Sequence, residues 1–161
     1  PHREGEAWVW EDRVMAVPEV EPPVVPIVMD MAALEQVKGL PQSDSPLEMD
    51  FFPVPIGIGE RGTRPFLPWM LLVVDRELGF VLQGEFLQAE PTLEAMWGSV
   101  PLKVLRQLRQ WQWVPRQVWV RSMLLEALLT PLGEELGFEI KEAADLPRLD
   151  EAKEFLLQRF T

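Results

Sequence analysis

The sequence predicts an α/β domain with a mixed β-sheet of about five strands, a central antiparallel hairpin and helices packed on the sheet. The hairpin is predicted over Pro65–Leu87, where a nearly unbroken apolar run and an alternating run flank the turn sequence Asp75–Gly79. From residue 47 onward, the predicted elements follow the order strand, strand, strand, helix, strand, helix, strand, helix. The later alternation of strands and helices requires parallel crossovers, so the sheet must be mixed.

Residues 1–46 form an acidic, proline-rich N-terminal segment, and residues 47–161 form the α/β core domain. Within the first segment, Pro18–Pro26 contains four prolines and two acids, which is typical of a linker or a sheet edge. A short helix follows at Asp30–Lys38, with Asp30 as its N-cap and Gly39 just past its end.

The core domain begins with Leu47–Ile58, an apolar alternating run whose two prolines predict an edge strand. Short strands are predicted at Gln117–Arg121 and Phe138–Lys141. Apolar residues at helical spacing predict helices over residues 91–113, 122–136 and 149–160. We expect the first to break at Gly98 and the second to kink or restart at Pro131.

The residue inventory excludes most catalytic classes. The chain of 161 residues has no cysteine and a single histidine, His2, which lies near the N-terminus outside the predicted core. Thiol chemistry, Ser-His-Asp triads and histidine-ligated zinc therefore lack a nucleophile, base or ligand. The phosphate-binding and dinucleotide-binding glycine motifs are also missing. Only carboxylate–metal or acid–base chemistry remains, so we expect no cofactor, with Mg²⁺ or Mn²⁺ as the alternative.

Charge and hydropathy limit the partners. The net charge is −11, and residues 1–60 alone carry 12 acidic against 3 basic side chains. This makes nucleic acid an unlikely partner, because phosphate binding needs surplus Lys and Arg. The longest apolar run, Pro65–Val74, is about half of a membrane span. Without a signal pattern or cysteines, we expect a cytoplasmic location and no membrane contact.

The predicted order of elements, with Asp75 ending a central apolar strand, resembles the ribonuclease H-like cores of transposases and retroviral integrases over residues 70–155. The resemblance implies three acids that bind two divalent metals: one on the first core strand, one after the fourth strand and one on a later helix. It places Asp75 in the first position, and Asp150, Glu151 or Glu154 in the third.

The second position reads Val120-Arg121-Ser122-Met123, and no carboxylate occurs between Glu94 and Glu126. A cation there would repel metal ions, so the resemblance implies a catalytically silent version of the fold. The chain is also similar to bacterial domains of unknown function with an R-P-x-x-P segment (residues 64–68) before a V-V-D strand end (residues 73–75). That resemblance implies no activity.

Two constellations remain as candidate sites. Asp75, Asp150 and Glu154 are the catalytic candidates, but Asp75–Gly79 also suits an ordinary polar turn, which we favour. The candidate binding residues are Lys103, Arg106, Arg109, Trp113 and Arg116, from a stretch in which cations alternate with tryptophans up to Arg121. The alternative is that these tryptophans belong to the core and that the cations are solvated or pair with the acidic first sixty residues.

We therefore expect a non-catalytic interaction or regulatory module of a larger bacterial protein, with a protein partner at the Lys103–Arg121 stretch or the proline-rich edge. The first alternative is a divalent-metal-dependent, nuclease-like enzyme. The second is a nucleic-acid-binding module without chemistry.

Overall fold

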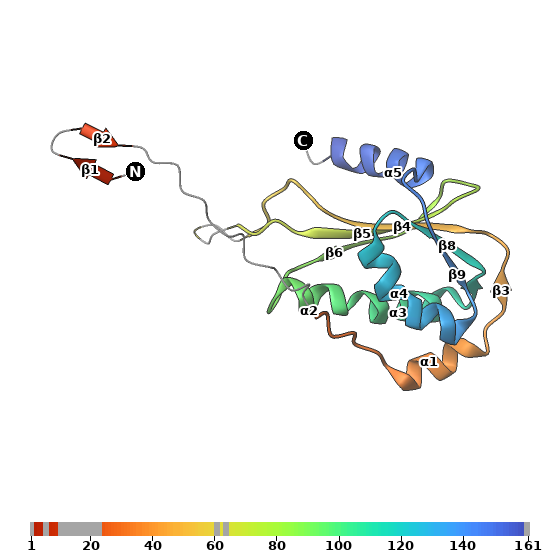
Figure 1. Ribbon diagram of the computed structural model, residues 1–161. Helices are drawn as coiled ribbons and strands as arrows, with labels where there is room; N and C mark the ends of the chain where they lie inside the picture. Colours follow the sequence, from red (N-terminus) through yellow and green to blue (C-terminus); the bar gives the residue numbers. More distant parts are fainter. Residues whose placement is uncertain (1, 5–6, 10–23, 60–61, 63–64, 160–161) are drawn as a thin grey trace.

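The computed structural model describes residues 2–4, 7–9, 24–59, 62 and 65–159, and its main feature is a mixed five-stranded sheet in the order β6-β5-β4-β8-β9 (Figure 1). The strands are β4 (Leu47–Pro53), β5 (Trp69–Asp75), β6 (Val81–Leu87), β8 (Gln117–Val120) and β9 (Glu139–Glu142). The first three are antiparallel neighbours, whereas β8 runs parallel to both β4 and β9. The predicted α/β class with a mixed sheet is confirmed.

The hairpin β5–β6 lies on one side of the sheet, and β4 occupies the centre that we assigned to the hairpin. The prediction of β4 as an edge strand is wrong, because Pro53 and Pro55 lie at and beyond its end. Only residues 47–49 of β4 pair with β8, so no proline of this strand lies where it has a paired strand on each side. The predicted turn is confirmed: the Gly79 N–H donates to the Asp75 carbonyl at 2.9 Å, and Gly79 has a φ of 74°.

Two small sheets accompany the main one. Strand β1 (His2–Glu4) pairs with β2 (Ala7–Val9), and β3 (Gln42–Ser43) pairs in parallel with β7 (Val114–Pro115). Most of the predicted linker Pro18–Pro26 lies outside the described residues.

Four helices cover one face of the sheet, below it in Figure 1: α1 (Met31–Lys38), α2 (Leu93–Gly98), α3 (Val100–Trp111) and α4 (Met123–Leu136). Three of these helices start at capping residues, because Asp30, Thr92 and Ser122 accept hydrogen bonds from N–H groups of the first turns of α1, α2 and α4. Helix α4 continues through Pro131 without a restart, since Leu128, Leu129 and Leu132 around the proline are buried in the core.

Helix α1 lies in the same layer as α3 and α4 and contributes Ala33, Leu34 and Val37 to the core, although it precedes residue 47. The extended segment before it runs along α2, where the Val28 N–H donates to the Gly98 carbonyl at 2.9 Å. A Cβ atom on Gly98 would lie 2.0 Å from the Pro26 carbonyl oxygen. Glycine is therefore required at this close approach of two backbones.

The opposite face of the sheet is covered by α5 (Pro147–Gln158), which packs on β4 and β5 (Figure 1). Its buried residues Leu149 and Ala152, with Leu146 just before the helix, belong to a second apolar core that also contains Phe52 and Leu72. No helix among the described residues combines the length and apolar composition needed to cross a membrane.

Candidate functional site

The predicted catalytic acids lie on opposite faces of the sheet. Residues 70, 72 and 74 of β5 face α5, so strand alternation places Asp75 toward the helical layer, whereas Asp150 and Glu154 belong to α5. Within the described residues, no three His, Cys, Asp or Glu side chains are grouped so that they could hold a metal ion. The structure does not bring Asp75 together with the other two candidates.

Asp75 instead fixes the turn of the hairpin. Its Oδ1 accepts hydrogen bonds from the N–H groups of Glu77 and Leu78, at 2.9 and 2.7 Å, and its Oδ2 accepts one from the Ser45 hydroxyl at 2.6 Å. Burial raises the pKa of this carboxyl, but the three hydrogen bonds together outweigh burial and leave the pKa below its ordinary value. These contacts are those of a structural turn residue.

Asp150 belongs to a different charge cluster, centred on Arg121 at the end of β8. The Arg121 Nη2 lies 2.7 Å from both carboxylate oxygens of Asp150, and its Nη1 lies 3.3 Å from Oδ2 of Asp50 on β4. The Arg121 Nε also donates to the Ala144 carbonyl at 3.0 Å. One guanidinium therefore lies between two carboxylates from different elements and balances part of their negative charge.

Asp50 is the buried member of this cluster, with 6% of the residue exposed. Its Oδ1 accepts a hydrogen bond from the Phe51 N–H at 2.9 Å. Burial raises the pKa of Asp50 above its ordinary value, although the positive charge of Arg121 opposes the change. The pKa of Arg121 is raised, chiefly by its hydrogen bonds to Asp150.

A second buried carboxylate, Glu48, lies two residues earlier on the same face of β4 and is fully buried. It accepts a hydrogen bond from the Leu149 N–H at 2.7 Å, in the first turn of α5, and forms an ion pair with Arg76 at 3.0 Å. The Arg76 guanidinium lies 4.2 Å from the centre of the Trp119 ring. Because α5 has no side-chain N-cap of its own, Glu48 supplies that function from the sheet.

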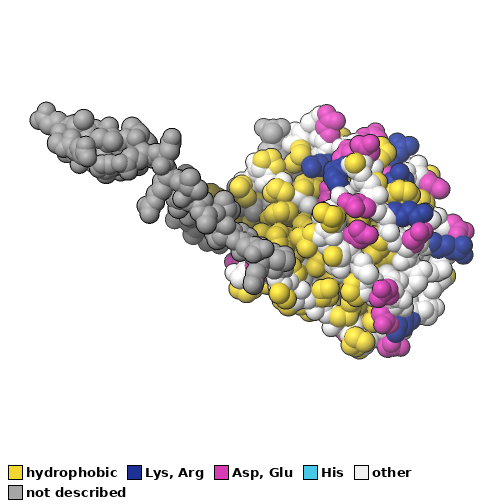
Figure 2. All heavy atoms as spheres, in the orientation of Figure 1, with side chains coloured by type: hydrophobic (Ala, Val, Ile, Leu, Met, Phe, Trp, Pro, Cys, Tyr) yellow, Lys and Arg dark blue, Asp and Glu magenta, His cyan; other side chains and the backbone are white. Residues whose placement is uncertain are grey.

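The predicted binding residues do not form one free basic surface, and on the face of the domain drawn in Figure 2 Lys and Arg side chains are interspersed with Asp and Glu. Lys103 pairs with Glu85 of β6, and Arg116 pairs with Asp44 at 2.9 Å. Trp113 stacks on Trp111, with ring centres 5.3 Å apart. In the described part of the chain, Arg106 and Arg109 have no ion-pair partner. These two exposed arginines of α3 line an open hollow of about 360 Å³ with Gln110 and Gln112.

A family model described as a domain of unknown function, DUF6930, matches residues 33–157. The chain belongs to this family. No curated protein matches it. In this DUF6930 domain the match includes all five strands of the main sheet, most of α1 and nearly all of α5.

Sequence reasoning missed Glu48 and Asp50, two buried carboxylates of β4 in this DUF6930 domain. The available signal was their spacing, since they are charged residues two apart in an otherwise apolar strand and therefore share a face with Phe52. Their partners could not be read from the sequence, because Glu48 meets Leu149 across 101 residues and Asp50 meets Arg121 across 71.

Proposed function

We propose that this DUF6930 domain is a non-catalytic interaction or regulatory module of a larger bacterial protein, working in the cytoplasm. The observation that carries this proposal is the position of Arg121 between Asp50 and Asp150. Two carboxylates this close to one point are what a divalent cation needs, but here a guanidinium already holds both. A metal ion would have to displace that cation or approach it directly, which its charge opposes.

We also propose that the domain has the layout of a ribonuclease H-like core without its catalytic set of acids. Counted along the chain, β4 is the first strand of the main sheet and β8 the fourth, so the first acid of such a site corresponds to Asp50 rather than Asp75. The second position then falls on Arg121 and the third on Asp150 of α5. These three residues meet in space, which supports a site of this layout whose central member is a cation instead of a carboxylate.

The interaction surface that we propose is the exposed side of α3 around Arg106 and Arg109. These arginines lie three residues apart on one helix face, and no carboxylate lines the hollow between them and Gln112. We infer a protein partner with acidic side chains. Two arginines can match a small acidic patch on a protein, whereas the continuous phosphate backbone of a nucleic acid would extend beyond them onto a chain whose net charge is −11.

The absence of catalysis can be tested by thermal unfolding with millimolar Mg²⁺ or Mn²⁺, together with an assay for metal-dependent cleavage of DNA and RNA. We expect neither a metal-dependent rise in Tm nor cleavage by the unmodified chain, because a ligand raises Tm only if it binds the folded state. Arg121→Gln provides the positive control. Its Tm should rise with Mn²⁺, whereas the Tm of Arg121→Gln/Asp150→Asn should not. Cleavage by the unmodified chain, lost in Asp150→Asn, would establish the nuclease-like alternative.

The proposed surface can be tested with two labelled probes of equal length, a glutamate-rich peptide and a single-stranded DNA, by fluorescence anisotropy. Arg106→Gln/Arg109→Gln should weaken peptide binding by roughly tenfold, whereas the control Arg148→Gln/Arg159→Gln, at the two ends of α5, should not. Tighter binding of DNA, falling steeply with salt, would instead support the nucleic-acid-binding module.

A further inference from the structure

The outer edge of β9 offers unpaired backbone groups. The N–H groups of Glu139 and Ala143 donate to the carbonyls of Arg116 and Val120, both at 2.9 Å, so these odd-numbered residues face β8. By strand alternation, the N–H and C=O groups of Ile140 and Glu142 point away from the sheet. Strand β9 is the last in the order, and the described part of the chain supplies no further strand beside it. The sheet can therefore be extended here by another chain.

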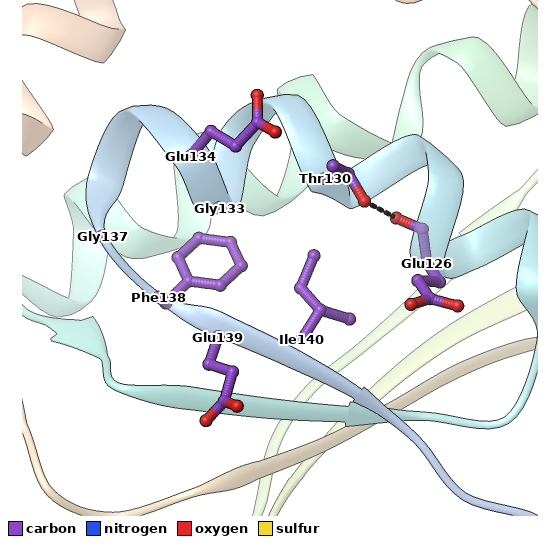
Figure 3. Close-up of a pocket in the computed structure, with 8 residues that line it drawn as sticks. All are labelled: Glu126, Thr130, Gly133, Glu134, Gly137, Phe138, Glu139 and Ile140. Atoms are coloured by element: carbon purple, nitrogen blue, oxygen red, sulfur yellow. Dashed lines mark hydrogen bonds between the residues drawn. The ribbon is translucent and has the colours of Figure 1, made fainter.

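A hollow of about 460 Å³ lies alongside this edge, between β9 and the outer flank of α4. Figure 3 shows Phe138, just before β9, and Ile140 on it pointing toward α4, whereas Glu139 points to the other side of the strand. Gly133 lets the helix lie close to the strand, since a Cβ atom on Gly133 would lie 2.9 Å from the Phe138 carbonyl oxygen. Phe138 and Ile140 thus form an apolar floor in the hollow. The side chains of a strand added beside β9 would lie on this floor.

The charges around the hollow are all negative. Its lining contains Glu126, Glu134 and Glu139 and no Lys or Arg. Only Glu139 is in an ion pair, with Lys141 at 3.2 Å, among the residues that the structure describes. Figure 3 shows Glu126 extending from α4 toward the level of the strand, while Thr130 donates to its backbone carbonyl at 2.8 Å. A Lys or Arg side chain fits this hollow, because its aliphatic part can lie on the apolar floor while its cationic end contacts Glu126.

The opposite edge of the sheet, β6, differs in its regularity and in its charge. In the β5–β6 pair the register shifts between Val73 and Val74, and such an irregularity disrupts further pairing. Glu85, the charged residue of β6, is already paired with Lys103. A second copy of the chain is also disfavoured at β9, because Glu139 and Glu142 would face the same charges on the other copy.

We propose that β9 is a docking edge for an extended, basic segment of a partner protein, which adds a strand to the sheet and places a Lys or Arg side chain in the hollow beside Glu126. The backbone hydrogen bonds to Ile140 and Glu142 hold the segment, and the hollow selects its side chain. This surface is separate from the arginines of α3, so the proposal does not depend on the acidic partner proposed for them.

The test uses a labelled seven-residue peptide of alternating Lys and Val, with binding to the whole chain followed by fluorescence anisotropy. A peptide of the same sequence, N-methylated along its backbone, keeps every side chain and charge but cannot form the strand's hydrogen bonds. We expect it to bind at least roughly tenfold more weakly, and a peptide of alternating Glu and Val not to bind. Equal binding of the N-methylated peptide, or no binding of the basic one, would overturn the proposal.

Two pairs of variants then locate the edge. Glu142→Pro removes one outward N–H and should weaken binding by roughly tenfold, whereas Glu142→Ala loses the same charge and should weaken it less than about threefold. Glu126→Gln should reduce affinity for the Lys peptide, and Glu151→Gln on α5 should not. Unchanged affinity of both Glu142→Pro and Glu126→Gln would place the peptide elsewhere and reject this edge, even if the peptide binds.

Discussion

The two faces of the sheet are covered in different ways. On one face, four helices bury a large apolar cluster that includes Leu34, Leu105 and Leu129. On the other, α5 alone covers a smaller apolar cluster next to two buried carboxylates, Glu48 and Asp50. Apolar packing is non-directional, whereas a buried carboxylate requires specific donors. We infer that packing supplies most of the stability of the helical face, while directional contacts fix where α5 lies on its face.

The largest expected effect is on the helical face. Leu129 of α4 is fully buried, so Leu129→Ala should lower the free energy of unfolding by about 3–4 kcal/mol through lost transfer energy and the cavity left behind. Urea denaturation followed by tryptophan fluorescence measures this loss. The control Leu78→Ala removes a side chain that is 66% exposed and should change stability by less than about 0.5 kcal/mol. Equal losses for the two variants would contradict a packed helical face.

On the α5 face, Glu48→Ala should cost about 3 kcal/mol, because it leaves Arg76 without its buried partner and the Leu149 N–H without an acceptor. The loss should be local: hydrogen exchange should accelerate in α5 more than in α4. The control Glu85→Ala removes a partly exposed partner of Lys103 and should cost less than about 1 kcal/mol. Uniform acceleration across both helices would show that Glu48 does not act specifically on α5.

At the hairpin turn, Asp75→Ala should cost about 2 kcal/mol at pH 7, because three hydrogen bonds to a carboxylate are lost. The pKa of Asp75 is lower in the folded state than in the unfolded chain, so its stabilisation is present above the unfolded pKa and disappears as the pH falls through the folded one. The difference between variant and unmodified chain should therefore shrink below about pH 4. A difference that is constant from pH 3 to 7 would show that the charge of Asp75 does not contribute.

Asp50 should show the opposite pH dependence and the smallest effect. Its pKa is raised in the folded state, so burial of the ionised form opposes folding, and this cost is relieved as the pH falls toward the unfolded pKa. Asp50→Asn keeps an acceptor for Phe51 and Arg121 and should change stability at pH 7 by less than about 1 kcal/mol. Chemical denaturation of the unmodified chain and of Asp50→Asn between pH 4 and 7 measures the pH dependence of stability and the effect of the substitution. A loss above about 2 kcal/mol would mean that the ion pair with Arg121 outweighs the burial of the charge.

The parts of the fold that follow local rules were predictable from the sequence. The helix starts at Asp30 and Ser122, the helix end at Gly137 and the turn at Asp75–Gly79 each depend on residues close together in the chain. The central position of β4 was not predictable in this way, because Pro53 and Pro55 signal an edge unless one knows that β8 pairs only with the start of the strand.

The candidate site was predictable only in part. Arg121 was recognised as a cation where the resemblance implied an acid, but its partners Asp50 and Asp150 come from positions 71 residues before it and 29 after it. Likewise, the basic stretch looked continuous, yet Lys103 and Arg116 pair with residues of other elements. Ion pairs of this kind depend on the tertiary fold and leave no periodic signal in the sequence.

The contact between Gly98 and the segment before α1 has a consequence for where the domain can be cut. A fragment that begins at residue 33, where the family match starts, keeps every strand of the main sheet but loses Val25, Pro26 and Met29. The partly buried side chains of Val25 and Met29 pack against the apolar core, and Pro26 lies against Gly98. Such a fragment would expose apolar surface around α2 to water, so the shortest piece expected to fold well begins no later than residue 25.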